Sequence, residues 1–254
     1  MNEKIEQKPN NEPPDNLSDS IDNKLASSEQ NDGKEYTEDK NTFLTHLKDM
    51  GYIDESIKRI DEAYALSYSI FSSIKRDTGE PYFKHLMGVS LILIDECKVE
   101  DPEMVIAALF HDAIEDSVVY GDTSMPMSEW RETAYTRLSK TFDSNVAKMV
   151  ITLTRPQVDG VEIKDDKEAH DVYISKLKET KDLRIILIKM ADRLHNLRTL
   201  EGTTLDKKRR VIKDTKKVYF DLFKRAKDFY PEQYGYLLKK MKLAINNVNL
   251  KTED

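Results

Sequence analysis

Apolar residues recur every three or four positions along most of the chain from Thr42 onward, as they do on the buried face of an amphipathic helix. The spacing is clearest between Ile57 and Ile74 and predicts a long helix that begins near Asp54. No run alternates apolar and polar residues as a half-buried strand would. Further helices are predicted over residues 82–97, 102–116, 128–140, 142–154, 167–179, 182–200, 205–228 and 231–248. The predicted fold class is therefore all-α, with many helices in an irregular arrangement.

The first 40 residues lack this periodicity. They hold three prolines, many Asn and Ser residues, and eleven Asp and Glu against five Lys. Such a segment buries too little apolar area to offset the conformational entropy that is lost on ordering. We therefore predict a disordered acidic tail over residues 1–40 and one domain over residues 41–254. The alternative is a tail that binds a partner or carries a targeting signal.

The composition agrees with a helical domain, because only 8 Gly and 8 Pro occur among 254 residues and Lys and Glu dominate the charged 34%. Cys97 is the only cysteine, which excludes an intramolecular disulfide and a cysteine-based zinc site. The chain has neither a signal-peptide pattern nor an apolar run of the ~20 residues that span a bilayer. These features predict a cytoplasmic protein. The formal net charge of −7 resides mostly in the tail.

Two polar clusters interrupt the apolar pattern. The first lies in ALFHDAIEDS, where an apolar run opens onto one imidazole and three carboxylates, those of His111, Asp112, Glu115 and Asp116. Carboxylates so close together repel one another unless a cation offsets their charge, and a metal ion would satisfy both His111 and Asp112. The alternative is a solvated helix end, which the apolar neighbours on both sides disfavour.

The second cluster lies in LIKMADRLHNLRTL. Asp192, His195, Asn196 and Thr199 occupy positions i, i+3, i+4 and i+7, which share one face of a helix. That face is polar where the face of a core helix would be apolar. A fully hydrogen-bonded buried network would explain it, but its similarity to the first cluster favours one shared site.

A third candidate is His85, which follows the turn signal GEP. A lone histidine in a mostly apolar helix is more often a core residue than a ligand. Together with His111, Asp112 and Asp192, however, it forms a mixed nitrogen and oxygen set suited to Mn²⁺, Fe²⁺, Zn²⁺ or Co²⁺. Two other histidines lie in more polar surroundings and are predicted to be surface residues: His46 and His170.

These motifs resemble a known family. His, then His-Asp, then Asp on separate helices is the pattern of the HD phosphohydrolase superfamily. The segments GEPYFKH, AALFHDAIEDS and LIKMADRLHNLRTL are similar to the hydrolase domain of the RelA/SpoT alarmone enzymes, and the similarity extends from about Thr42 to Phe229. It implies an HD-domain fold and a Mn²⁺-dependent 3′-pyrophosphohydrolase that converts (p)ppGpp to GDP or GTP and pyrophosphate. Nothing resembles the synthetase domain of the bifunctional members, so we expect a stand-alone small alarmone hydrolase.

The resemblance also implies roles for individual residues. Four would bind the Mn²⁺ cofactor: His85, His111, Asp112 and Asp192. Two would form the catalytic acidic pair that orients and deprotonates the attacking water: Glu115 and Asp116. Four would contact the nucleotide or its phosphates: Arg76, Arg155, Asn196 and Thr199. These roles agree with metal-ion catalysis, in which the ion lowers the pKa of bound water and polarises a phosphoryl oxygen.

Two positions depart from the family pattern. Asp77 stands where relatives usually have Lys, and it puts a negative charge near an anionic substrate. Leu86 stands where they usually have Pro, which changes the geometry of the helix start. The basic segment 207–217 could suggest nucleic-acid binding, but its interspersed apolar and acidic residues favour a solvated face. The expected partner is thus a small-molecule nucleotide, and neither nucleic acid nor a membrane; the sequence predicts no oligomeric state.

Two other functions compete with (p)ppGpp hydrolysis. The same fold and metal could act on an adenosine alarmone, or on a 2′- or 3′-phosphorylated nucleotide such as NADPH, and Asp77 is the only support for this version. Alternatively, the protein could be a non-catalytic regulator or an antitoxin-like partner. The complete set of metal-binding and acidic residues disfavours that last reading.

Overall fold

The computed structural model describes residues 32–117, 119–120, 127–155 and 166–250. Within these ranges the chain is all-α, and no strand forms beyond one isolated bridge between Lys75 and Pro81. The predicted fold class is therefore confirmed. In the part of the chain that the structure describes, no helix has both the length and the apolar content that crossing a membrane requires. The cytoplasmic location stays a prediction.

The first described helix, α2 (Asp32–Asp49), begins inside the predicted tail rather than at residue 41. Its later part packs on the core through Phe43 and Leu47, which are fully buried. The preceding segment is rich in the helix formers Lys and Glu, so the same helix continues toward the N-terminus without apolar periodicity. The rest of the predicted tail, residues 1–31, lies outside the described ranges.

Most of the other helices begin and end close to the predicted positions, with two exceptions, the C-terminal end of the helix predicted over residues 102–116 and the segment predicted as one helix over residues 205–228. The other helices are α3 (Asp54–Phe71), α4 (Tyr82–Leu91), α5 (Pro102–Leu109), α6 (Met127–Thr141), α7 (Ser144–Leu153), α8 (Asp166–Glu179), α9 (Arg184–Arg198), α10 (Leu205–Asp214), α11 (Phe220–Phe223) and α12 (Pro231–Asn247). π-helical turns extend α4 over Ile92–Glu96 and α10 over Thr215–Tyr219, and the 3₁₀ turn Lys224–Ala226 follows α11. The single helix predicted over residues 205–228 is thus divided into four short pieces.

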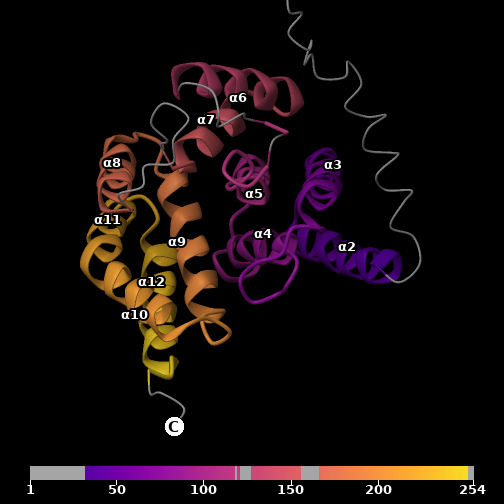
Figure 1. Ribbon diagram of the computed structural model, residues 1–254. Coiled ribbons are helices and arrows are strands. Elements are labelled where there is room, and N and C mark those ends of the chain that lie inside the picture. The colour runs from indigo at the N-terminus through magenta and orange to yellow at the C-terminus, as the bar shows by residue number, and fades with distance from the viewer. Residues whose placement is uncertain (1–31, 118, 121–126, 156–165, 251–254) are drawn as a thin grey trace, which may run out of the picture.

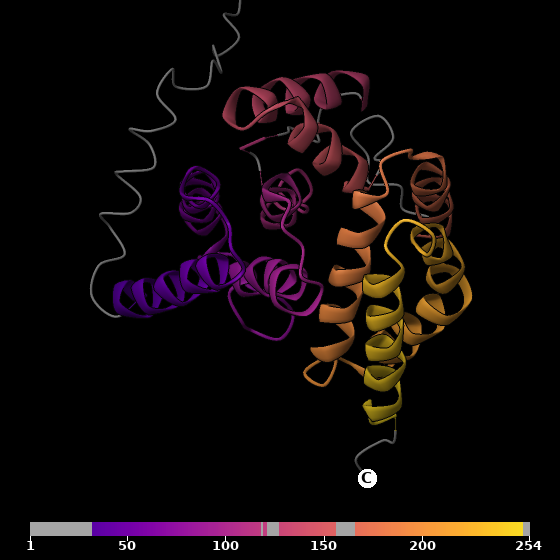
Figure 2. The ribbon, with the colours of Figure 1, turned by 180° about the vertical axis from the view of Figure 1, so that it is seen from behind.

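Helix α9 runs through the middle of the molecule and organises the fold (Figure 1). It contacts α4, α5 and α7 on the side of the N-terminal helices and α12 along its other side. The view from behind shows α12 lying alongside α9 (Figure 2). Residues from Ile185 to Leu194 on α9 are all buried, and they include Asp192. The central helix therefore carries a carboxylate into the interior, toward the helices that hold the other predicted ligands.

The helix predicted over residues 102–116 is wrong at its C-terminal end, because α5 stops at Leu109. The backbone at Phe110 has φ −123° and ψ 7°, and consecutive turns follow as far as residue 116. Nδ1 of His111 donates to the carbonyl of Ala108 at 2.8 Å. The imidazole thereby satisfies a carbonyl that a continuing helix would offer to a backbone N–H. His111 and Asp112 therefore lie on tight turns after the helix, and not on the faces of a regular one.

Candidate active site

The four predicted metal ligands converge, although they come from three separate segments. Nε2 of His85 lies 3.4 Å from Oδ1 of Asp192 and 3.7 Å from Oδ2 of Asp112. Nε2 of His111 lies 3.1 Å from the same Asp112 oxygen and 3.8 Å from the same Asp192 oxygen. Donor atoms of His85, His111 and Asp112 all fall within 4.8 Å of one another. The packing of α4, α5 and α9 thus brings together a His/Asp cluster with the composition of a metal site.

The orientation of His111 fits this cluster to a cation. Because Nδ1 donates to Ala108, Nε2 points its lone pair toward the carboxylates, and this buried atom has no hydrogen-bond partner among the described residues. A lone pair 3.1 Å from a carboxylate oxygen is repulsive unless a proton or a metal ion lies between them. Two ligands of one ion, with bonds of about 2.1 Å, lie about 3.0–3.4 Å apart. The observed separations are close to that range, so the cluster could hold a divalent metal.

Without a metal, a proton takes that place. Burial lowers the pKa of His111, but the nearby carboxylates of Asp112 and Asp192 outweigh burial and raise the pKa to about 10. For Asp112, burial acts in the other direction and raises the pKa. The adjacent His111 has the larger effect and holds the pKa of Asp112 below its ordinary value. The carboxylates of the cluster are therefore ionised at neutral pH, as metal binding requires.

Both carboxylate oxygens of Asp192 have partners. Oδ2 pairs with Nζ of Lys189 at 2.7 Å, and Oδ1 accepts a hydrogen bond from Nδ2 of Asn196 at 2.6 Å. Burial raises the pKa of Asp192, but Lys189 and the two imidazoles outweigh burial and lower it well below the ordinary value. Oδ1 is thereby aimed at the imidazoles while Oδ2 faces the lysine.

The predicted nucleotide contacts Arg76, Asn196 and Thr199 also lie together. Arg76 donates from Nη2 to Oδ1 of Asn196 at 2.6 Å and from Nη1 to Oγ1 of Thr199 at 3.2 Å. Hydrogen bonds therefore run from Arg76 through Asn196 to Asp192. The neighbouring Asp77 pairs with Nζ of Lys207 at 2.5 Å, which offsets the negative charge noted in the sequence.

The two predicted acidic residues occupy different positions. Asp116 is exposed and lines the pocket beside the metal cluster. Glu115 is half-buried, and its Oε1 accepts a hydrogen bond from the backbone N–H of Arg155 at 2.5 Å. Burial and the charge of Asp112 raise the pKa of Glu115 to about 7. Although the Asp116 side chain reaches solvent, partial desolvation by the pocket wall and the charge of Asp112 also raise its pKa. Both carboxylates are therefore better proton acceptors than ordinary ones.

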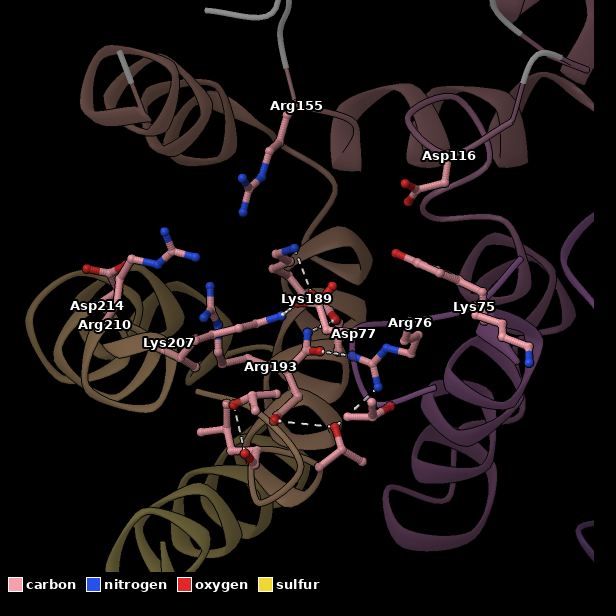
Figure 3. A pocket seen from close by; sticks show the side chains of 18 of the residues that line it. Lys75, Arg76, Asp77, Asp116, Arg155, Lys189, Arg193, Lys207, Arg210 and Asp214 are labelled. Atoms are coloured by element: carbon pink, nitrogen blue, oxygen red, sulfur yellow. Dashed lines mark hydrogen bonds and ion pairs between the residues drawn. The ribbon is translucent and has the colours of Figure 1, made fainter. Parts of the chain in front are cut away.

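A pocket of about 510 Å³ adjoins these groups, and of the four predicted metal ligands only Asp192 lines it. Figure 3 shows Lys207 and Arg210 entering from α10, Arg155 from the segment after α7, and Asp116 from the opposite side. Cationic side chains dominate the wall: Lys75, Arg76, Arg155, Lys189, Arg193, Lys207 and Arg210. Four carboxylates stand among them: Asp77, Asp116, Asp192 and Asp214. The excess of positive charge beside a His/Asp cluster suits a phosphorylated ligand.

Comparisons with known proteins identify the family of this chain. The model of the HD domain family matches residues 63–227. The chain belongs to the HD domain family. This HD domain chain is 31% identical to the bifunctional (p)ppGpp synthase/hydrolase SpoT of Escherichia coli (strain K12) over 210 residues, which are 76% of the chain and 27% of that relative. It is 32% identical to a guanosine-3′,5′-bis(diphosphate) 3′-pyrophosphohydrolase of Vibrio cholerae over 220 residues, which are 79% of the chain and 29% of the relative.

The chain thus spans less than a third of the length of these curated relatives. A solved structure of a metazoan SpoT orthologue, which hydrolyses ppGpp and plays a role in starvation responses, superposes with a TM-score of 0.54. It is 22% identical and the match covers 76% of this chain and 97% of that one. That likeness supports the HD domain fold.

Two more side chains contact the HD domain cluster: Tyr82, which the sequence did not single out, and His195, which was expected on the polar face but was given no role. The hydroxyl of Tyr82 donates to Oδ2 of Asp112 at 2.8 Å, and Nδ1 of His195 lies 3.0 Å from Nδ1 of His85. Burial, His85 and Arg76 lower the pKa of His195 to about 3, so its imidazole is neutral. Tyr82 precedes His85 by three residues, a helical spacing that could have signalled a shared face.

The surface prediction is wrong for His170 and incomplete for the basic segment. His170 was expected at the surface, but it is partly buried, lines the pocket and lies 5.8 Å from the ring of Tyr219. The basic side chains of segment 207–217 are mostly exposed, as expected of a solvated face, but Lys207 and Arg210 on α10 also line the pocket. His46 is partly exposed and pairs with Asp95 at 2.8 Å.

Proposed function

We propose that this chain is a Mn²⁺-dependent guanosine-3′,5′-bis(diphosphate) 3′-pyrophosphohydrolase, which converts (p)ppGpp to GDP or GTP and pyrophosphate. The observation that carries the proposal is the His/Asp cluster, which borders through Asp192 a pocket with seven cationic side chains and the carboxylate of Asp116. The relatives that bear this name support the choice of substrate.

In this proposal His85, His111, Asp112 and Asp192 bind the Mn²⁺. Imidazole nitrogens and carboxylate oxygens together suit such an ion. When bound, the ion would lower the pKa of water and polarise a phosphoryl oxygen. Tyr82 would hold Asp112 in place through its hydrogen bond to Oδ2, and Lys189 and Asn196 would do the same for Asp192.

The acidic pair would manage the proton of the attacking water. Asp116 faces the pocket, so its carboxylate would orient the water and accept its proton. Glu115, whose pKa is raised to about 7, would take up a proton near neutral pH. The water oxygen forms a bond to the phosphorus next to the ribose, the bond from phosphorus to the 3′ oxygen breaks, and that oxygen regains a proton.

The cationic wall would bind the rest of the substrate. Arg155 and Lys189 both line the pocket and both act electrostatically on Glu115, so they would offset the charge of a 3′-diphosphate bound beside the acidic turn. Arg76, which is held by Asn196 and Thr199, would form the wall beside the nucleoside.

The competing functions have less support. Asp77 is the reason to consider an adenosine alarmone or NADPH, and its carboxylate is paired with Lys207, so it presents less negative charge to a substrate. Burial contributes little to Asp77, whose pKa is lowered by that lysine. A regulatory or antitoxin-like role does not account for two carboxylates with raised pKa values beside a His/Asp cluster.

A substrate panel tests the proposal. Purified protein with Mn²⁺ would be given ppGpp, adenosine 3′,5′-bis(diphosphate) and NADPH, and kcat/KM would be measured for each. We expect a clear preference for ppGpp, and a loss of about 10²–10⁴-fold or more in kcat for the double variant Glu115→Gln/Asp116→Asn. The matched control is Asp54→Asn/Glu55→Gln, an adjacent acidic pair that is exposed at the start of α3. No turnover of ppGpp by metal-loaded protein would overturn the proposal.

A further inference from the structure

His195 lies on α9 with its ring against the ring of His85 on α4. The two ring centroids are 4.8 Å apart with an angle of 67° between the planes, and the two Nδ1 atoms are 3.0 Å apart. Two imidazole nitrogens at this distance share one proton, since one must donate and the other accept. The position of that proton decides which nitrogen of His85 has a free lone pair.

Gly88 makes this contact sterically feasible. It lies three residues after His85 on the same helix, and a Cβ atom at position 88 would stand 2.3 Å from Nε2 and 2.5 Å from Cδ2 of His195. Real Cβ atoms do not approach other atoms so closely, so any larger residue would displace the His195 ring. Gly235, on α12, has no atom within 4 Å of the equivalent position. The close approach is therefore a particular feature of Gly88.

The geometry of His85 determines the direction of the hydrogen bond once a metal is bound. Nε2 is the nitrogen that faces the carboxylates, at 3.4 Å from Asp192 and 3.7 Å from Asp112. If Nε2 binds the metal, the proton must be on Nδ1, which then donates to Nδ1 of His195. In His111 the proton is fixed on Nδ1 by a backbone acceptor, because Nδ1 donates to the carbonyl of Ala108.

We propose that His195, seated on Gly88, is a positioning residue that fixes the Nδ1–H tautomer and the ring orientation of His85 for metal binding. This inference rests on the metal site of the proposed function. His195 touches neither the pocket-facing carboxylates nor the donor nitrogen of His85; it acts only through Nδ1 of that ring. Outer partners of this kind typically contribute about 10–100-fold to metal affinity.

The main test compares two substitutions of His195. His195→Leu removes the acceptor, whereas His195→Asn keeps an acceptor oxygen near the position of Nδ1. We expect Mn²⁺ affinity, measured from the electron paramagnetic resonance signal of free Mn²⁺, to fall about 10–100-fold in His195→Leu and to recover most of that loss in His195→Asn. Equal affinity of His195→Leu and wild type would overturn the inference. If wild type itself binds no Mn²⁺, the metal site fails together with the inference that rests on it.

Gly88→Ala tests independently whether the close packing of the His195 ring against Gly88 is needed for metal binding. Gly235→Ala is the matched control, because a Cβ atom there would meet no atom within 4 Å. We expect Gly88→Ala to weaken Mn²⁺ binding as His195→Leu does, and Gly235→Ala to leave it unchanged. Circular dichroism establishes that each variant is folded. In ¹⁵N-histidine-labelled protein loaded with Zn²⁺, the ring-nitrogen shifts of His85 should show a protonated Nδ1 in wild type. A proton on Nε2 of His85 would contradict the inference whatever the affinities.

Discussion

The ion pair between Lys189 and Asp192 offers a sharp test of the site, because α3 contains an exposed pair for comparison. Nζ of Lys189 lies 2.7 Å from Oδ2 of Asp192, and the two side chains are 10% and 4% exposed. Lys58 and Glu62 on α3 form a pair at 4.0 Å whose side chains are 79% and 68% exposed. Both pairs lie within about one helical turn, but the pair on α9 is buried and close, whereas the pair on α3 is exposed and more widely separated.

The expected loss of unfolding free energy in Lys189→Met follows from the burial of its partner Asp192. The substitution keeps most of the apolar stem that packs near Tyr173, whose ring lies 5.3 Å from Nζ, but it leaves Asp192 ionised and buried. Removing one partner of a buried pair costs about 3–5 kcal/mol. Breaking an exposed helical pair costs only about 0.3–0.5 kcal/mol, which is the change expected for Lys58→Met.

Urea unfolding, followed by circular dichroism, measures both variants in EDTA and in saturating Mn²⁺. We expect Lys189→Met to lose about 3–5 kcal/mol of unfolding free energy in EDTA. The loss should be smaller in Mn²⁺, because the ion supplies Asp192 with a positive charge. A loss below about 1 kcal/mol in EDTA would refute the buried-pair argument. An equal loss in the two conditions would refute Asp192 as a metal ligand.

Three further predictions follow from individual contacts. Tyr82→Phe removes the hydrogen bond to the ionised Asp112, worth about 1.5–3 kcal/mol, so a Mn²⁺ titration should show affinity falling about 10- to 100-fold. Because the pKa of Glu115 is raised to about 7, its protonated carboxyl stabilises the metal-free protein at low pH, whereas His195, with its lowered pKa, has the opposite effect on stability in the acidic range. The unfolding free energy of wild type relative to that of Glu115→Gln should therefore fall as the pH rises from about 4.5 to 7. Asp77→Asn should lower the KM for ppGpp without changing kcat, because it removes a negative charge from the pocket wall while Lys207 remains.

Each of the variants at Tyr82, Glu115 and Asp77 has its own control or contrary result. For Tyr82, the control is Tyr52→Phe, which loses a buried hydrogen bond to the carbonyl of Val99 and should lower stability without affecting Mn²⁺ affinity. For Glu115, the unfolding free energies of wild type and Glu115→Gln are compared between about pH 4.5 and 7. An identical pH dependence in the two proteins would show that the pKa of this carboxyl is not raised in the folded state. For Asp77, an unchanged KM would mean that the substrate does not approach this part of the wall.

Local periodicity was sufficient to predict most of the helices and the polar face of α9. Asn196 and Thr199 were expected to share a face, and they do, because a spacing of three or four residues within a helix needs no tertiary information. Lys189 stands at the same spacing from Asp192 and could have been identified too. It was overlooked because it lies in an otherwise apolar run.

The features that sequence alone could not predict depend on contacts between segments. Apolar residues continue past Leu109, so periodicity extends α5 to residue 116, whereas the ring of His111 takes the carbonyl of Ala108 and turns follow. Gly88 is an unremarkable glycine in the sequence, and its role depends on how closely α9 approaches α4. Lys207 and Arg210 of α10 line the pocket because of how α10 packs in the fold. Charge and hydropathy patterns along the sequence therefore could not predict this placement.

The proposed hydrolysis is tested most directly by a ³¹P nuclear magnetic resonance time course of ppGpp with the purified chain and Mn²⁺. The proposal predicts that the signals of ppGpp are replaced by those of GDP and inorganic pyrophosphate in equal amounts, and that EDTA stops the reaction. Unchanged ppGpp in the presence of metal-loaded protein would contradict it. Release of orthophosphate in place of pyrophosphate would contradict cleavage at the 3′ ester.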